Sequence, residues 1–209
     1  MTSSPDGSSR SASGGLAHTG SDVLSDDVAD EPLAPERQSA LDAVLAVLRE
    51  ADLEWSPLSR TSLSVELPGE KKLQTPCRFD VGPHALGVHA FVCRQPDENH
   101  TGVYRWMLER NMKMFAFGFA LDGVGDIYLD ARLPLEAATP DGIDRLLGSV
   151  LEYADGSFNT LLELGFASSI RKEWEWRISR GESVRNLEAF RVPLRLDDLG
   201  SPSDESRSS

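Results

Sequence analysis

The sequence predicts an antiparallel α+β domain, and three observations support this fold class. Residues 115–133 read FAFGFALDGVGDIYLDARL, two alternating apolar runs joined by a glycine-containing turn, which indicates a β-hairpin. Apolar residues at helical spacing stand before and after this hairpin. Strands that cluster in hairpins favour an antiparallel sheet over parallel βαβ units. We therefore expect a five-stranded sheet with helices packed on it, in the order α-β-β-β-α-β-β-α, followed by a helical extension.

The first half of this order is a helix and three strands. A helix begins at Pro35, where the missing N–H costs nothing, and its apolar stripe consists of Leu41, Val44, Leu45 and Leu48. Residues 55–67 break the helical period, and Leu63, Val65 and Leu67 alternate with polar residues as in a half-buried strand. Residues 72–81 and 84–94 form the next two strands, joined by Gly82-Pro83.

The second half begins with a helix from His100 that leads into the Phe-rich hairpin. In that hairpin we expect Phe115, Phe117, Phe119 and Leu121 on one face of the first strand. Thr139 and Pro140 then mark the start of a long helix. Asp155-Gly156 is a candidate interruption, although the apolar pattern continues to Phe166, and Gly165 ends the segment. Further helices are expected over 169–180, ending near Gly181, and over 183–190.

Composition divides the chain into one domain and two tails. Residues 1–35 are mostly Ser, Gly, Asp, Ala, Thr and Pro and contain no aromatic residue, and 193–209 is assigned to a similar tail. Such segments bury too little apolar surface to offset the entropy of ordering, so both tails are expected to be disordered. Residues 36–192 then form one domain of ordinary size.

Charge and hydropathy exclude several classes of protein. The net charge is −13, and an acidic chain is a poor general binder of nucleic acid, because phosphate affinity comes mainly from Lys and Arg. There is no apolar run of about 18 residues to span a membrane, and the N-terminus does not resemble a signal peptide. Two cysteines do not suggest a disulfide scaffold. The expected location is the cytoplasm.

Three strings resemble the YbjN-domain proteins of actinobacteria. They are GVHAFVCRQPDENHTGVYRWMLERNMKM, FALDGVGDIYLDARLPL and FNTLLELGFASSIRKEWEWRISRGES, and the resemblance spans approximately residues 36–192. It implies a fold similar to the chaperones of type III secretion, an antiparallel sheet with helices packed against it, often dimeric. The family is described as a sensory transduction regulator, and no catalytic residues carry over from it.

One cluster invites a metal-site interpretation. Cys77, His89 and Cys93 fall near one another on the predicted hairpin. With the turn at Gly82-Pro83, Cys77 lies opposite roughly His89, while Cys93 is four residues further along, about 13 Å away at ~3.4 Å per residue. A shared tetrahedral site or a disulfide does not tolerate that separation. We expect buried structural thiols, with no metal and no cofactor.

The loop QPDENH is the candidate for acid–base chemistry. Asp97, Glu98 and His100 cluster there, with Tyr104 and Arg105 nearby, and a histidine beside a carboxylate suits proton transfer near neutral pH. The competing and favoured interpretation is that the carboxylates serve the first turn of the following helix. Asn99 or Thr101 would then be the cap.

Two surfaces are candidate protein-binding sites. On the helix over 169–180, Lys172, Trp176 and Arg180 share one side, where tryptophan can stack with cations or anchor a partner. The alternative is that Trp176 packs under the C-terminal segment, while Trp174 closes the core.

The second surface is the small-residue side of the Phe-rich strand. Ala116, Gly118 and Ala120 permit the close approach of another backbone or helix. Packing of a helix from the same chain is the favoured explanation. A dimer interface or a groove for a client segment is the other.

These observations lead to two expectations about function. The first is a non-catalytic, chaperone- or adaptor-like module with a possible regulatory role, which binds a partner protein and, from the resemblance, forms a homodimer. The alternative is a small-ligand sensor or an enzyme that uses the loop from Asp97 to His100.

Overall fold

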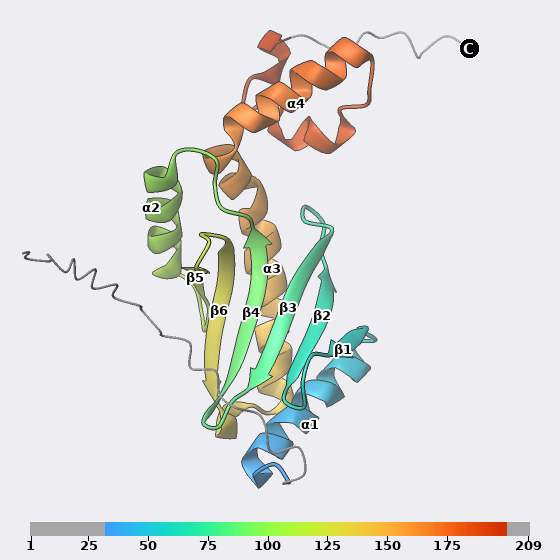
Figure 1. Cartoon of the computed structure of the whole chain (residues 1–209), viewed down its shortest axis with the longest axis vertical. Helices are drawn as coiled ribbons and strands as arrows, with labels where there is room; N and C mark the ends of the chain where they lie inside the picture. The colour runs from blue at the N-terminus through green and yellow to red at the C-terminus, as the bar shows by residue number, and fades with distance from the viewer. Residues whose placement is uncertain (1–31, 200–209) are drawn as a thin grey trace, which may run out of the picture. The chain divides into compact units, whose positions relative to one another are not determined.

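The computed structural model describes residues 32–199, and Figure 1 shows the arrangement of the elements. The chain forms helix α1 (Pro35–Glu50) and then strands β1 (Trp55–Pro57), β2 (Ser62–Pro68), β3 (Gln74–Val81) and β4 (Ala85–Cys93). Helix α2 (His100–Asn111) is followed by β5 (Gly118–Leu121) and β6 (Ile127–Pro134). The last elements are η1 (Leu135–Ala137), α3 (Pro140–Gly165), α4 (Ala167–Arg180), η2 (Arg185–Phe190) and η3 (Leu196–Leu199).

The strands form one antiparallel sheet in the order β1-β2-β3-β4-β6-β5. The fold class is confirmed, but the sheet has six strands and not five. The additional strand is β1, which pairs Trp55 with Val65 and Pro57 with Leu63 at one edge. Three residues that include a proline carry no alternating pattern, which is why the sequence did not reveal this strand.

The two faces of the sheet differ. Helices α1 and α3 lie behind one face in the view of Figure 1, and the side chains of that face are buried. The alternation in β2, β3, β4 and β6 places every second side chain on the opposite face, where the residues are half-buried or exposed. Among residues 32–199, no helix covers that open face.

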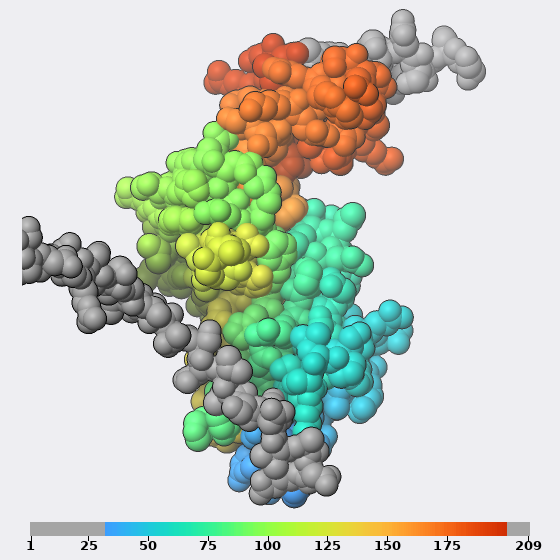
Figure 2. Space-filling model, viewed as in Figure 1, coloured from blue at the N-terminus to red at the C-terminus, as the bar shows by residue number. Residues whose placement is uncertain are grey.

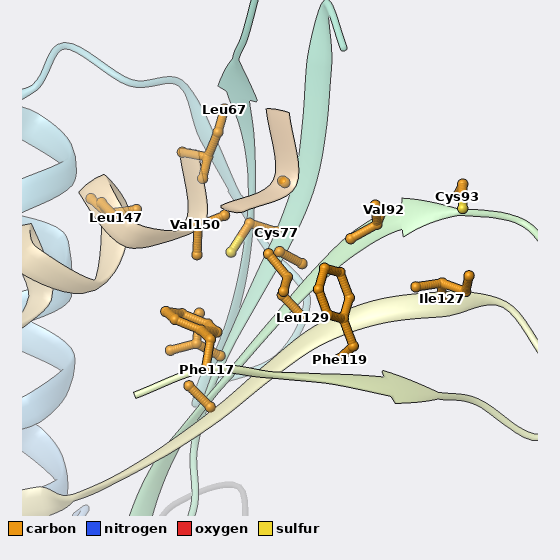
Figure 3. Close-up of a cluster of buried hydrophobic side chains, with 14 of the residues drawn as sticks. Leu67, Cys77, Val92, Cys93, Phe117, Phe119, Ile127, Leu129, Leu147 and Val150 are labelled. Carbon is orange, nitrogen blue, oxygen red and sulfur yellow. The ribbon is translucent and has the colours of Figure 1, made fainter. Parts of the chain in front are cut away.

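The core lies between the sheet and α3. Figure 3 shows Cys77, Leu129 and Val150 among the side chains that fill it. Burial of this apolar surface supplies the main stabilising free energy, at about 25 cal/mol per Å² removed from water. The predicted inward residues of β6, Ile127 and Leu129, are fully buried, so the period of the second hairpin strand is confirmed.

The Phe-rich strand begins later than predicted. Ala116 has a φ of +63°, and the amide of Phe117 donates to the carbonyl of Phe115 over 2.7 Å, which makes a tight turn. The strand therefore starts at Gly118. Phe117 and Phe119 are buried, whereas Phe115 is 71% exposed, so the predicted apolar face is not continuous.

Helix α3 runs without a break through Asp155 and Gly156, so the candidate interruption does not occur and the helix follows the continuous apolar pattern. Its N-terminus is as expected, because the Thr139 hydroxyl accepts from the Gly142 amide. The Asp155 side chain has another role. Its Oδ1 accepts hydrogen bonds from the amides of Lys71 and Lys72, at 2.7 and 2.9 Å, and thereby fixes the β2–β3 loop.

The C-terminal extension is a helical unit made of α4, η2 and η3. Trp174 is fully buried within it, together with Leu194 and Leu196. Residues 193–199 therefore belong to the folded part, further along the chain than the predicted boundary at 192. The rest of that tail, and most of the predicted N-terminal tail, lie outside the described residues. Within residues 32–199, no helix combines the length and apolar character needed to cross a bilayer.

Candidate functional site

A shallow groove of about 560 Å³ lies on the open face of the sheet. Phe91 of β4 pairs with Tyr128 of β6, and Tyr128 pairs with Ala120 of β5, so their side chains follow one another across three strands. The rings of Phe91 and Tyr128 meet edge to face, with centroids 5.5 Å apart. In Figure 2, atoms of the teal to yellow segments, which include β3, β4 and the β5–β6 turn, form the surface at this face.

The groove has an apolar floor and apolar margins. The small side chain of Ala120 leaves room beside the two rings, and the margins are the exposed side chains of Leu58 and Leu121, which are 57% and 44% exposed. Aromatic and aliphatic surface that remains accessible on a folded domain gains free energy when a partner covers it. The complete lining is Leu58, Ser64, Pro76, Cys77, Arg78, His89, Phe91, Ala120, Leu121, Asp122, Tyr128 and Asp130.

A row of polar side chains borders this floor. His89 lies between two carboxylates, with Nδ1 2.5 Å from Asp130 Oδ1 and Nε2 3.5 Å from Asp80 Oδ2. Arg78 Nε is 2.7 Å from the same Asp80 oxygen. All four side chains stand on the open face, on adjacent strands. The row therefore supplies donors and acceptors in a fixed order beside the apolar floor, which suits the recognition of a polar backbone or side chain.

Lys72 is a buried cation next to this site. Its Nζ lies 4.8 Å from the centroid of the Phe91 ring and donates to the Phe91 carbonyl, at the irregular step of the β4–β6 pairing. Burial lowers the pKa of this amine from 10.5 to about 8, while Cys93 and Glu66 act in the opposite direction. Lys72 thus fixes one side of the Phe91 ring.

Comparison with known proteins identifies the family. The YbjN model, described as "Putative bacterial sensory transduction regulator", matches residues 40–163, which is more than half of the chain. This protein belongs to the YbjN family. The predicted resemblance is therefore confirmed.

Mycobacterial proteins named as uncharacterized are similar to this YbjN protein. One from Mycobacterium leprae is 59% identical over 138 residues, which cover 66% of this chain and 74% of the relative. One from Mycobacterium tuberculosis strain H37Rv is 55% identical over 129 residues, which cover 62% of this chain and 70% of the relative.

The loop QPDENH joins the YbjN domain to the helical extension. The amides of Asp97 and Glu98 both donate to the carbonyl of Gly165, at the end of α3. Their side chains reach α4. Glu98 accepts from the amide and hydroxyl of Ser168 at 2.6 and 2.8 Å, and Asp97 accepts from the Ser169 hydroxyl at 2.8 Å. We call residues 94–99 and these partners the latch.

The latch corrects the predicted role of the carboxylates. They do serve the start of a helix, but that helix is α4 and not α2. Asn99 is the residue before α2, as predicted, yet its side chain does not cap α2 and instead donates to the carbonyl of Leu164. A helix that begins 70 residues away in sequence cannot be identified from local spacing.

Hydrogen bonds and nearby charges lower the pKa values of both latch carboxylates. Hydrogen bonds from Arg94 and then from Ser169 lower the pKa of Asp97 from 3.8 to about 2. The amide and hydroxyl of Ser168 lower the pKa of Glu98. His100 forms no ion pair with either carboxylate and instead lies beside Tyr104, with ring centroids 6.0 Å apart. The loop therefore does not assemble the acid–base pair that the sequence allowed.

The sheet separates the residues of the suggested metal cluster. Cys77 pairs with Ala90 and points into the core, whereas His89 pairs with Arg78 on the open face. The predicted register was one residue off, which placed Cys77 opposite His89. The irregular step after Phe91 brings Cys93 into the core as well, where both thiols are free. Burial raises the pKa of Cys77 to about 12 and of Cys93 to about 11.

Helix α4 presents the predicted row of Lys172, Trp176 and Arg180 on its outer side. The Arg180 guanidinium lies 4.8 Å from the centroid of the Trp176 ring, and this tryptophan is 44% exposed. Trp176 therefore does not pack under the C-terminal segment. Trp174, two residues earlier, is fully buried as predicted.

The three small residues are not on one strand face. Ala116 precedes the strand in a left-handed conformation and is exposed. Gly118 faces the side chain of Asn111, because a Cβ built there would lie 3.5 Å from Asn111 Nδ2. Ala120 lines the groove. The favoured explanation, close packing of a helix on this surface, therefore applies at most to Gly118.

Sequence reasoning missed the groove, although part of its signal was present. Phe91 and Tyr128 are large aromatic residues at the outward positions of two alternating strands. Such positions are usually polar on a solvated face. Their adjacency could not be read, because β4 pairs with β6 across an intervening helix and strand.

Proposed function

We propose that this YbjN protein is a non-catalytic regulatory module that binds a segment of a partner protein on the open face of its sheet. One observation carries the proposal. The face opposite α1 and α3 holds a groove with an edge-to-face aromatic pair, Phe91 and Tyr128, at its floor. Aromatic residues are enriched at the centres of protein interfaces.

The shape and polarity of the groove favour a polypeptide. Apolar side chains of a bound segment would cover the two rings and Leu58, while the row of Arg78, His89 and Asp130 would meet polar groups. Such a site holds its occupant by surface burial and orients it by hydrogen bonds. This division of roles suits reversible binding by an adaptor.

We propose a non-catalytic role because the polar side chains that could act as acid or base already pair with other residues of the protein. His89 is paired with Asp130 in the groove, and Arg78, which also lines it, is paired with Asp80 beside it. At the latch, Asp97 and Glu98 accept hydrogen bonds from serines. An acid or base needs a free position within hydrogen-bond reach of its substrate. The groove is lined by none of the residues from Asp97 to His100.

We also propose a homodimer with a secretion-chaperone-like mode of action, in which the partner is held without being converted. The support is the resemblance together with an exposed apolar set near the end of α2. Leu108, Met112 and Phe115 are 67%, 87% and 71% exposed. Sedimentation velocity should show a dimer that Met112→Glu dissociates. A monomer at micromolar concentration in the unaltered protein would contradict the dimer.

A small-ligand sensor is the second candidate. A groove of about 560 Å³ also lies in the range of small-molecule sites, roughly 300–1,000 Å³. A compact ligand would stack on Phe91 and Tyr128 beside the polar row. This alternative predicts a metabolite that remains with the purified protein and is released on denaturation.

The experiment that separates these functions fills the groove. Ala120→Trp places a large side chain beside Tyr128, and Ala137→Trp makes the same change at an exposed position in η1. Both variants and the unaltered protein are used as bait in a mycobacterial extract. We expect a discrete partner protein to be lost only with Ala120→Trp. Equal recovery with all three baits would refute the groove, and a released metabolite would favour the sensor.

A further inference from the structure

We propose that the outer side of α4 is a second binding site, specific for an extended acidic segment of a protein. The site is the row of Lys172, Trp176 and Arg180. It lies in the helical extension, outside the residues that match the family model, and it does not depend on the groove.

Exposure of Trp176 is not required by the packing of the extension. Trp174 already fills the interior of this unit and is fully buried. Arg177 pairs with Glu173 at 2.6 Å and donates to the Ser183 carbonyl, which secures the inner side of α4. Among residues 32–199, the Trp176 indole makes no hydrogen bond and no ring–ring contact, and the Arg180 guanidinium lies 4.8 Å from the centroid of its ring. The ring is therefore oriented by Arg180 and remains 44% exposed.

The two cations of the row are available to a partner. Among residues 32–199, Lys172 and Arg180 lie within 4.0 Å of no carboxylate, in contrast to Arg191, which pairs with Glu188 and Asp197. Lys172 does lower the pKa of Asp97 by its charge, so it stands close to the latch. Two acidic side chains lie between these cations in sequence, and Glu173 is paired with Arg177, so the row together with the exposed Glu175 keeps a net positive charge.

Charge distribution over the chain supports an acidic partner. Residues 167–199 contain seven basic and six acidic residues, whereas 33–166 contain 12 basic and 20 acidic residues. The extension is thus weakly positive beside a strongly acidic domain. Nucleic acid would be repelled by that domain, because its affinity depends on many Lys and Arg contacts to phosphates. A short acidic segment needs only the local row.

The spacing of the row specifies the segment. Eight residues of α-helix separate Lys172 from Arg180, a rise of about 12 Å. An extended chain covers that distance in three to four residues at ~3.4 Å each. The segment therefore carries two carboxylates about four residues apart, with an apolar side chain between them that rests on Trp176. Apolar contact and cation–π stacking supply affinity, and the carboxylates fix the register.

The test is a titration of the ¹⁵N-labelled full chain with the peptide acetyl-GEALAEG-amide, and binding is monitored by NMR spectra of the protein. We expect saturable shifts centred on residues 172–180 that weaken as salt is raised. Lys172→Glu and Arg180→Glu together should lower the affinity at least tenfold, and Trp176→Ala several-fold. The single charge-reversal control Arg49→Glu, at an exposed position on α1, and the groove variant Ala120→Trp should leave binding unchanged.

Three results would overturn the proposal. The first is an absence of saturable chemical-shift changes at 50 mM salt. The second is that Arg49→Glu and the variants of Lys172, Trp176 and Arg180 bind the peptide with equal affinity. The third is that the protein binds a 20-nucleotide thymidine oligomer at this site more tightly than the peptide. A peptide with lysine in place of both glutamates serves as the negative probe. Because Ala120→Trp is included, failure of this site is distinguishable from failure of the groove.

Discussion

Glu98 connects the YbjN domain to the helical extension, because its carboxylate accepts hydrogen bonds from both the amide and the hydroxyl of Ser168, 70 residues away. A carboxylate at the first turn of a helix satisfies free amides and interacts favourably with the helix dipole. Asp97 accepts a hydrogen bond from the hydroxyl of the next residue, Ser169. The Arg94 guanidinium completes the latch by pairing with Asp97 and stacking on Phe166, at 4.5 Å from the ring centroid.

Removal of the Glu98 carboxylate should loosen α4 without unfolding the sheet. In Glu98→Ala we expect the first-turn amides of α4, near residue 168, to exchange several-fold faster with deuterium, because one amide loses its acceptor. Amides of β4 should be unaffected. The matched control is Glu152→Ala, an exposed position on α3. Unchanged exchange of the α4 amides in Glu98→Ala would show that the latch does not stabilise the start of α4.

Acidification should open the latch in a defined interval. The pKa of Asp97 in the folded protein is about 2, below its ordinary value of 3.8. A carboxyl group with a depressed folded pKa stabilises the protein above its unfolded value and loses that contribution as pH falls through the folded value. Exchange in α4 should therefore accelerate between about pH 4 and pH 2. In Asp97→Asn the acceleration over this interval should be smaller, and an identical pH profile would contradict the assignment.

The two tryptophans of α4 should differ sharply in their contribution to stability. Trp174 is fully buried, so Trp174→Ala should lower the free energy of unfolding of the helical extension by about 3–5 kcal/mol. Trp176 is 44% exposed, so Trp176→Ala should change the free energy of unfolding by less than about 0.5 kcal/mol. Urea denaturation followed by circular dichroism gives both values. A large loss in Trp176→Ala would mean that the exposed ring is structural after all.

Asn111 should protect the free edge of β5. Its Oδ1 accepts from the Phe119 amide at 2.8 Å and its Nδ2 donates to the Phe119 carbonyl, so it occupies positions where another strand would pair. Asn111→Leu should lower the free energy of unfolding by about 1–3 kcal/mol and promote self-association through the exposed edge of β5. Asn111→Asp, which keeps the acceptor, should have a smaller effect. Denaturation and light scattering check both outcomes, and a stable Asn111→Leu protein of unchanged mass would refute this role.

Local patterns predicted most of the elements, because their signals are contained in short stretches. Thr139 and Pro140 mark the start of α3, and Gly181 has a φ of +67° after α4, where glycine was expected. The inward residues of β2 and β6 followed from alternation alone. The strand β1 and the turn at Ala116 lacked such signals, since each is set by contacts with neighbouring segments.

The candidate sites were less predictable, since they depend on which segments meet. The outer row of α4 follows from helical spacing, and the Arg180–Trp176 stack was anticipated. The groove needs the pairing of β4 with β6, and the latch needs Ser168 to approach Glu98. Neither the β4–β6 pairing nor the contact between Ser168 and Glu98 produces a periodic pattern in the sequence. A single-residue error in register was also enough to put Cys77 and His89 on the same face.

Site-specific photo-crosslinking in living cells tests the central claim most directly. A benzophenone amino acid is placed at Ala120, in the groove, and at Glu152, on the exposed side of α3, in a mycobacterial host. If the open face holds a partner protein, position 120 gives a discrete crosslinked protein under illumination and position 152 does not. If neither position crosslinks, or both give the same products, the open face is not the binding site.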